Sequence, residues 1–199
     1  MRLPLLFIGM LVASGAEAQT LVGSESSARV PSPVELDTTG LFLAKLVRVG
    51  DDVFIAGQPS AEGLREMKRR GVATVVNLRS PPEMERLGFD EAALVEELGM
   101  RYVYLPMRAG TTWPYSPEAL RDFAEVMKSA DGKVLLHCTI AWRASHLWTA
   151  YLIKERRMAV ADALAHGRAI NLMDDHRMDD GQQPIELFLG ATVPGLGRP

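Results

Sequence analysis

The chain has little cysteine, few aromatic residues and little net charge. Its single cysteine, Cys138, excludes a disulfide within the chain and therefore a disulfide-stabilised scaffold. Aromatic residues make up only 7% of the sequence. A formal net charge of -3, without a dense basic tract, gives no reason to expect a nucleic-acid partner. The apolar stretch Leu3–Val12 is too short for a comfortable membrane span.

The N-terminus has the features of a secretory signal. Arg2 supplies a positive charge before the apolar stretch, and Ala16-Glu17-Ala18 fits a small-x-small cleavage site before Gln19. We therefore expect residues 1–18 to be a cleaved signal peptide and the mature protein to be periplasmic or secreted. Without this segment, no stable membrane insertion is expected.

The remaining chain is long enough for one domain. With 47% apolar residues, its composition is that of an ordinary globular protein with a sizeable core. Residues 19–40 are rich in small and polar residues and predict a flexible leader. The domain is expected over residues 41–173. Residues 174–199 predict a mostly irregular tail, in which Ile185–Leu189 could dock on the domain.

Strand and helix patterns alternate through the domain. Apolar strands are predicted at residues 53–55, 72–78, 102–105 and 133–137. Amphipathic helices are predicted after the capping residues Ser60, Asp90 and Ser116, and again over residues 144–152 and 160–172, whereas Ser80-Pro81-Pro82 predicts a break. This order indicates a single-domain α/β fold, with a mainly parallel sheet of four or five strands flanked by helices.

The segment His137–Ser145 carries the clearest chemical signal. Cys138 follows an apolar strand and precedes a helix, and Arg143 stands five positions later. Loop amides, the helix dipole and a guanidinium all favour a thiolate, and cysteines in such settings have pKa values of roughly 3.5–7.5. The same donors would bind an anion, and the planar fork of Arg143 suits a phosphate, sulfate or thiosulfate.

Three motifs carry a resemblance to a known superfamily. In this sequence they read Ala56-Gly57-Gln58-Pro59-Ser60, Gly71 to Arg79, and His137-Cys138 to Arg143. With them, the chain resembles the cysteine-dependent (dual-specificity and tyrosine) phosphatases. The likeness is greatest to the bacterial group related to the phosphatase-like domain of β-lactamase hydrolase-like proteins.

This resemblance implies a phosphatase-like fold with a Cys-x4-Arg loop. Cys138 would be the nucleophile that forms a phosphocysteine, and Arg143 would clamp the oxyanion. The implied substrate is a phosphotyrosine-like or small phosphate ester, either a small anionic molecule or a phosphoprotein. The remaining substrate contacts are expected from the loop and the first helical turn: Thr139, Ile140, Ala141, Trp142, Ala144 and Ser145.

The loop leaves an alternative open. Four residues separate Cys138 from Arg143, whereas the phosphatase signature has five. A shorter loop encloses fewer amides and also suits a rhodanese-like sulfurtransferase that carries a persulfide on Cys138. Because the loop has no glycine, Ile140 or Ala141 must adopt a strained backbone. Ser145 could support the sulfur or be an ordinary first-turn serine, and Trp142 could line a pocket or anchor the loop.

No obvious general acid is present. The loop of residues 106–113 contains no carboxylate, although phosphatases of this kind use an aspartate on such a neighbouring loop to protonate the leaving group. Four aspartates of the tail could serve instead or form a solvated surface: Asp174, Asp175, Asp179 and Asp180. The missing acid also leaves open a catalytically weak anion-binding module.

Several other polar residues have modest expected roles. His166 and His176 match no ligand spacing, so neither a metal nor another cofactor is expected. His137 is interpreted as a structural histidine, and Gln58 as part of the rim of the site. Arg79 could add positive potential or form a surface salt bridge.

Overall fold

The structure is a computed structural model that describes residues 30–175 and 177–197. The predicted signal peptide and the start of the predicted leader lie outside these residues, as does His176. The strands are β1 (Pro33–Leu36), β2 (Leu46–Val49), β3 (Val53–Ala56), β4 (Val72–Asn77), β5 (Arg101–Tyr104) and β6 (Lys133–His137). The helices are α1 (Ala61–Arg69), α2 (Pro81–Met84), α3 (Glu91–Glu97), α4 (Pro117–Ser129), α5 (Trp142–Lys154), α6 (Val160–Ile170) and α7 (Pro184–Leu189).

One sheet with the strand order β1-β2-β3-β6-β4-β5 organises the domain. Strands β3, β6, β4 and β5 run parallel, as the sequence predicts. The sheet has six strands instead of four or five, because β1 and β2 add an antiparallel extension beside β3. Strand β1 lies within residues 19–40, so the expectation of a flexible leader is wrong for this part of the segment.

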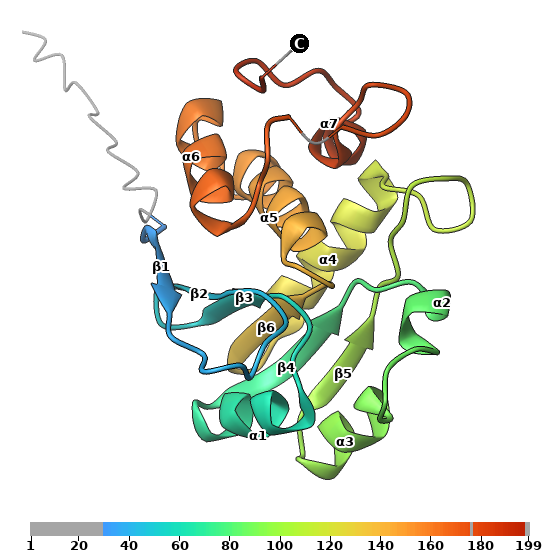
Figure 1. The fold of residues 1–199 in the computed structure, drawn as a ribbon. Helices are drawn as coiled ribbons and strands as arrows, with labels where there is room; N and C mark the ends of the chain where they lie inside the picture. The colour runs from blue at the N-terminus through green and yellow to red at the C-terminus, as the bar shows by residue number, and fades with distance from the viewer. Residues whose placement is uncertain (1–29, 176, 198–199) are drawn as a thin grey trace, which may run out of the picture.

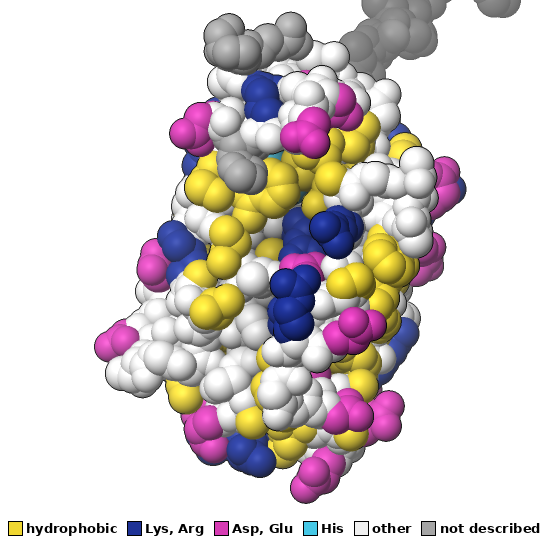
Figure 2. All heavy atoms as spheres, turned by 45° about the vertical axis from the view of Figure 1, so that its right-hand side comes forward, with side chains coloured by type: hydrophobic (Ala, Val, Ile, Leu, Met, Phe, Trp, Pro, Cys, Tyr) yellow, Lys and Arg dark blue, Asp and Glu magenta, His cyan; other side chains and the backbone are white. Residues whose placement is uncertain are grey.

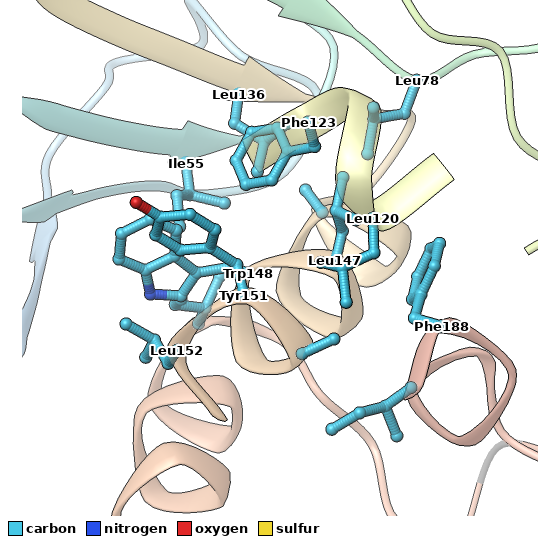
Figure 3. Close-up of a cluster of buried hydrophobic side chains, with 14 of the residues drawn as sticks. Ile55, Leu78, Leu120, Phe123, Leu136, Leu147, Trp148, Tyr151, Leu152 and Phe188 are labelled. Carbon is cyan, nitrogen blue, oxygen red and sulfur yellow. The ribbon is translucent and has the colours of Figure 1, made fainter. Parts of the chain in front are cut away.

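Helices cover both faces of the sheet (Figure 1). Helices α1 and α3 pack on one face through Leu64, Met67 and Val95. Helices α4, α5, α6 and α7 contribute to the core on the other face. In Figure 3, Phe123 of α4 lies beside Leu136 of the central strand β6, and Leu147 of α5 belongs to the same buried cluster. Because β6 is covered on both sides, its last four residues are buried.

Helix α5 is the centre of the second layer. Its residues from Arg143 to Leu152 are all buried, between the sheet on one side and helices α6 and α7 on the other. Helix α7 contains the segment predicted to dock and begins one residue before it, and Ile185 and Phe188 bury against this core. This packing fixes the start of α5, and with it the cysteine loop, on a rigid support.

The break predicted at Ser80-Pro81-Pro82 is a short helix, α2. Ser80 and Glu83 form a reciprocal capping box, and proline occupies the first helical positions, where its missing N–H costs nothing. Within the described part of the chain, no helix is long and apolar enough to span a membrane.

Candidate active site

The cysteine loop lies at the carboxyl ends of the parallel strands. It leaves β6 at His137 and enters α5 at Trp142. The N–H of Gln58 donates to the carbonyl of Thr139 at 2.9 Å. The side chain of Asn171, after α6, donates to the carbonyl of Ile140 at 2.6 Å. The end of β3 and the end of α6 therefore hold the loop from two sides.

Glycine at position 57 is required by this close approach. A Cβ atom there would lie 3.0 Å from the carbonyl oxygen of Thr139 and 2.9 Å from the backbone nitrogen of Ala44. Both neighbours are backbone atoms, which cannot move aside without moving the loop. The backbone of the motif Ala56-Gly57-Gln58 thus packs directly against the cysteine loop and supports it.

Ala141 carries the backbone strain that the missing glycine predicts. Its φ angle is 67°, in the left-handed region, and it stands at the N-cap of α5. This conformation costs a non-glycine residue roughly 1–2 kcal/mol. The turn directs the chain into α5 directly after the loop, so that Arg143 lies in the first turn.

Arg143 is turned into the protein. Only 8% of the residue is exposed, and Nη1 donates to the carbonyl oxygens of Met107 at 2.8 Å and Leu78 at 3.2 Å. Nη1 also donates to Oε2 of Glu83 at 2.9 Å, and Nη2 donates to Oε1 at 2.5 Å. Among the described residues, the hydrogen-bond partners of Arg143 engage Nη1 and Nη2.

Glu83 is the main functional residue that sequence reasoning missed. Burial alone would raise its pKa, but hydrogen bonds from Arg143, Thr139 and Ser80 outweigh burial and hold the pKa well below 4.5. Glu83 is therefore ionised and forms a charge-assisted pair with Arg143. The signal in the sequence was the spacing Ser80-x-x-Glu83, which is that of a capping box.

Cys138 lies deep in this arrangement. The residue is 1% exposed and packs within the core cluster below the loop. Burial would lower the pKa of Arg143, but Glu83 and the charge of Cys138 outweigh it and raise the pKa. Burial raises the pKa of Tyr115 to about 12. The interaction with Arg143 opposes this rise, and the interaction with Cys138 adds to it. Cys138, Arg143 and Tyr115 thus share one electrostatic environment.

The structure separates the expected loop contacts. Thr139 donates from Oγ1 to Glu83 at 2.7 Å, whereas Ile140 is 42% exposed at the rim. Trp142 packs edge-on against His146, with ring centroids 4.8 Å apart. Ala144 is buried on α5.

Ser145 uses its donors within helix α5. Its hydroxyl donates to the carbonyl of Trp142 at 2.7 Å, and its N–H donates to the carbonyl of Ala141 at 2.8 Å. Both of its donors therefore serve the first turn of α5. Of the two roles that the sequence allows for Ser145, the structure favours that of a first-turn helix serine.

Arg79 and Gln58 are not surface residues. Arg79 is buried, and its Nη1 donates to Oε1 of Gln58 at 2.7 Å while Nη2 donates to the carbonyl of Glu83 at 2.9 Å. Arg79 therefore links the motif after β3 to helix α2. The alternative of a surface salt bridge is wrong for this residue.

The tail aspartates have different environments. Asp174 pairs with Arg168 at 2.8 Å. Asp179 and Asp180 line a cavity together with Tyr115 and the loop of residues 109–114, the loop that lacks a carboxylate.

Seen from the side of α2, Lys and Arg side chains gather at the middle of the surface, and hydrophobic side chains lie above them (Figure 2).

Comparison with known proteins agrees with this geometry. A family model described as "DSP-PTPase phosphatase fused to NAD+ Kinase" matches residues 49–183, which include the loop and every strand from β3 onward. The chain belongs to this phosphatase family. Fold and family place the domain among proteins of the dual-specificity and tyrosine phosphatase type.

Curated relatives match over the same domain. The chain is 28% identical to a β-lactamase hydrolase-like protein of Xylella fastidiosa over 132 residues. This alignment covers 64% of this chain and 30% of that protein. The chain is 29% identical over 108 residues to one of Agrobacterium fabrum, which covers 52% and 24% respectively. The match thus spans less than a third of the length of these relatives.

Solved structures share the fold. TpbA of P. aeruginosa, in a cysteine-to-serine form in complex with phosphotyrosine, has a TM-score of 0.57 and 20% identity, covering 83% of this chain and 93% of that one. A DUF442 protein of Shewanella putrefaciens has a TM-score of 0.53 and 26% identity, covering 68% and 85%. These likenesses confirm the phosphatase-like α/β fold.

Proposed function

We propose that this protein is an exported cysteine-dependent phosphatase that hydrolyses a phosphotyrosine-like or small phosphate ester on Cys138. The observation that carries the proposal is the inward guanidinium of Arg143, fixed end-on by Glu83 beside the cysteine loop. A guanidinium fixed in this way presents its Nε–H to a phosphoryl oxygen without losing further side-chain freedom.

The proposed reaction proceeds in two displacements. The sulfur of Cys138 attacks phosphorus, and the bond to the ester oxygen breaks, with the electron pair leaving on that oxygen. Water then attacks the phosphocysteine, and the phosphorus–sulfur bond breaks to release phosphate and restore the thiolate. Arg143 and the loop amides stabilise the charge on the transferring oxygens.

The absence of a general acid in the neighbouring loop favours one kind of leaving group. The loop of residues 106–113 offers no carboxylate, so an aryl oxygen, whose anion is a weak base, leaves more readily than an alkyl oxygen. This supports an aryl phosphate, such as a phosphotyrosine side chain in a protein or a small aryl ester, as the substrate. Export is supported by the signal-like segment at residues 1–18 alone.

Two assays of the purified mature protein test the proposal. Wild type is expected to release phosphate from p-nitrophenyl phosphate, and Cys138→Ser is expected to release none while remaining folded by circular dichroism. The same samples are incubated with thiosulfate and cyanide. Thiocyanate formation without phosphate release would show a sulfurtransferase. Silence in both assays, with anion binding retained, would show a binding module.

A further inference from the structure

A buried carboxylate lies beneath the cysteine loop. Glu91, the first residue of α3, is 1% exposed. Its Oε2 accepts from Nε2 of Gln58 at 2.5 Å, and its Oε1 accepts from Nδ2 of Asn77 at 2.9 Å. Oε1 also lies 3.0 Å from Nε2 of His137. These three donors stand at the ends of β3, β4 and β6, so one carboxylate joins the three central strands where the site begins.

The carboxylate is ionised. Burial would raise its pKa, but the charge and hydrogen bond of His137, the hydrogen bond of Gln58 and the charge of Arg79 outweigh burial and lower the pKa below 4.5. An ionised carboxylate can only accept hydrogen bonds, so Nε2 of His137 carries the hydrogen of this pair. Glu91 thus fixes both the orientation of the ring and the hydrogen on Nε2.

Stability alone does not account for this arrangement. A buried charge must recover a large desolvation cost, and apolar residues of the same volume often serve stability equally well. Charged and titratable groups act on Glu91 from β5, β6 and the segment after β4: Tyr102, Tyr104, His137 and Arg79. Such clusters of buried titratable groups are typical of functional sites.

We propose that Glu91 is a positioning residue that holds the nucleophile Cys138 through His137, an inference that rests on the proposed phosphatase function. His137 is fixed on two sides, by Glu91 at its ring and by the N–H of Leu78, which donates to its carbonyl at 3.0 Å. The next peptide bond leads to Cys138. The ring is therefore held one residue from the nucleophile, and loss of its partner is expected to displace Cys138.

Glu91 is also connected to Arg143, but through a longer series of hydrogen bonds. Gln58 connects Glu91 to Arg79, and Arg79 donates to the carbonyl of Glu83. Glu83 itself is held independently by Ser80 and Thr139. Loss of Glu91 is therefore expected to displace the nucleophile more than the anion clamp, so that kcat falls and KM changes little.

A spectroscopic measurement tests the link. In wild type, the Nε2–H of His137 is expected to give a slowly exchanging imidazole resonance by NMR, assigned by its loss in His137→Gln. Glu91→Gln is expected to shift this resonance or remove it, whereas the exposed Glu97→Gln on the same helix leaves it unchanged. A resonance identical in Glu91→Gln and wild type overturns the proposal.

Kinetics test the consequence. Glu91→Gln is expected to lower kcat for an aryl phosphate roughly 10–100-fold, with KM within about threefold. Val95→Ala, a core change on the same helix, controls for lost stability and is expected to retain kcat below its unfolding temperature. The double variant with His137→Gln is expected to lose no more than the worse single variant, because both break one link. If Glu91→Gln does not fold, His137→Gln alone carries the kinetic test.

The outcomes separate this inference from the proposed function. An active wild type with unchanged kcat in Glu91→Gln, or additive losses in the double variant, overturns the positioning role alone. A wild type that releases no phosphate overturns the proposed function and this role with it.

Discussion

Glu83 holds Arg143 end-on, with Oε1 2.5 Å from Nη2 and Oε2 2.9 Å from Nη1. Each partner comes from a separate element, α2 and α5, and Nη1 of Arg143 also donates to the carbonyl of Leu78, the residue that follows β4. The carboxylate fixes the plane of the guanidinium, and Nη2 also donates to Oγ1 of Thr139 in the cysteine loop at 3.0 Å. The short helix α2 therefore belongs to the site, although it contains no residue of the recognised motifs.

Replacement of Arg143 by lysine tests the fork geometry. Lysine keeps the charge but cannot donate in parallel to Glu83 and to an anion. We expect Arg143→Lys to weaken competitive inhibition by vanadate roughly 10–100-fold, which corresponds to about 1.5–3 kcal/mol for a hydrogen bond to a charged group. The exposed Arg121→Lys on α4 is the control and should behave as wild type.

Glu83→Gln tests the charge of α2 through its effect on acid stability. Because the pKa of Glu83 is lower in the folded state than its ordinary 4.5, its stabilising effect is present above pH 4.5 and is lost as the pH falls toward the folded value. Urea unfolding between pH 7 and pH 3 should show a shallower decline for Glu83→Gln than for wild type. Parallel declines would mean that the ion pair adds nothing to stability.

Gly57→Ala tests the close packing of the backbone at Gly57 against the cysteine loop. The added Cβ would meet the carbonyl of Thr139 at 3.0 Å, so the loop must shift. We expect a fall in kcat/KM of about tenfold or more and a loss of about 1–3 kcal/mol in the free energy of unfolding. Gly88→Ala is a matched control, because nothing lies within 4 Å of its Cβ position. Equal effects at both positions would refute the close-approach argument.

Ala141→Gly tests the strain in the turn. Glycine tolerates the φ angle of 67°, so relief of strain offsets both the lost methyl group and the greater freedom of the unfolded chain. The free energy of unfolding should stay within about 1 kcal/mol of wild type. The same change at the buried Ala150, inside α5, should cost more, since there glycine has only disadvantages. A larger loss at Ala141 than at Ala150 would argue against strain.

Much of the fold and the reactive loop could be predicted from the sequence. The caps at Ser60, Asp90 and Ser116 are present, and each accepts a hydrogen bond from the helix that it begins. The apolar character of residues 72–78 correctly indicated a strand, which is Val72–Asn77 in the structure. Local signals of this kind lie within one turn or one strand and survive in any tertiary context.

The charged groups around the loop could not be predicted in the same way. Glu83 and Glu91 lie 60 and 46 residues from their partners Arg143 and His137, and neither carboxylate belongs to a recognised motif. Two prolines before Glu83 suggested a break, although proline is well tolerated in a first helical turn. Strand β1 was missed because a short strand at a sheet edge carries little hydrophobic pattern, and none of its residues is fully buried.

The covalent intermediate is the most direct test of the account. Wild type is mixed with excess p-nitrophenyl phosphate, quenched within milliseconds and digested with a protease. The mass of the peptide that contains Cys138 is then measured by mass spectrometry. One added phosphoryl group is expected on this peptide in wild type and none in Cys138→Ser, together with a burst of p-nitrophenol equal to the enzyme concentration. Steady phosphate release with an unmodified Cys138 peptide and no burst would contradict the account.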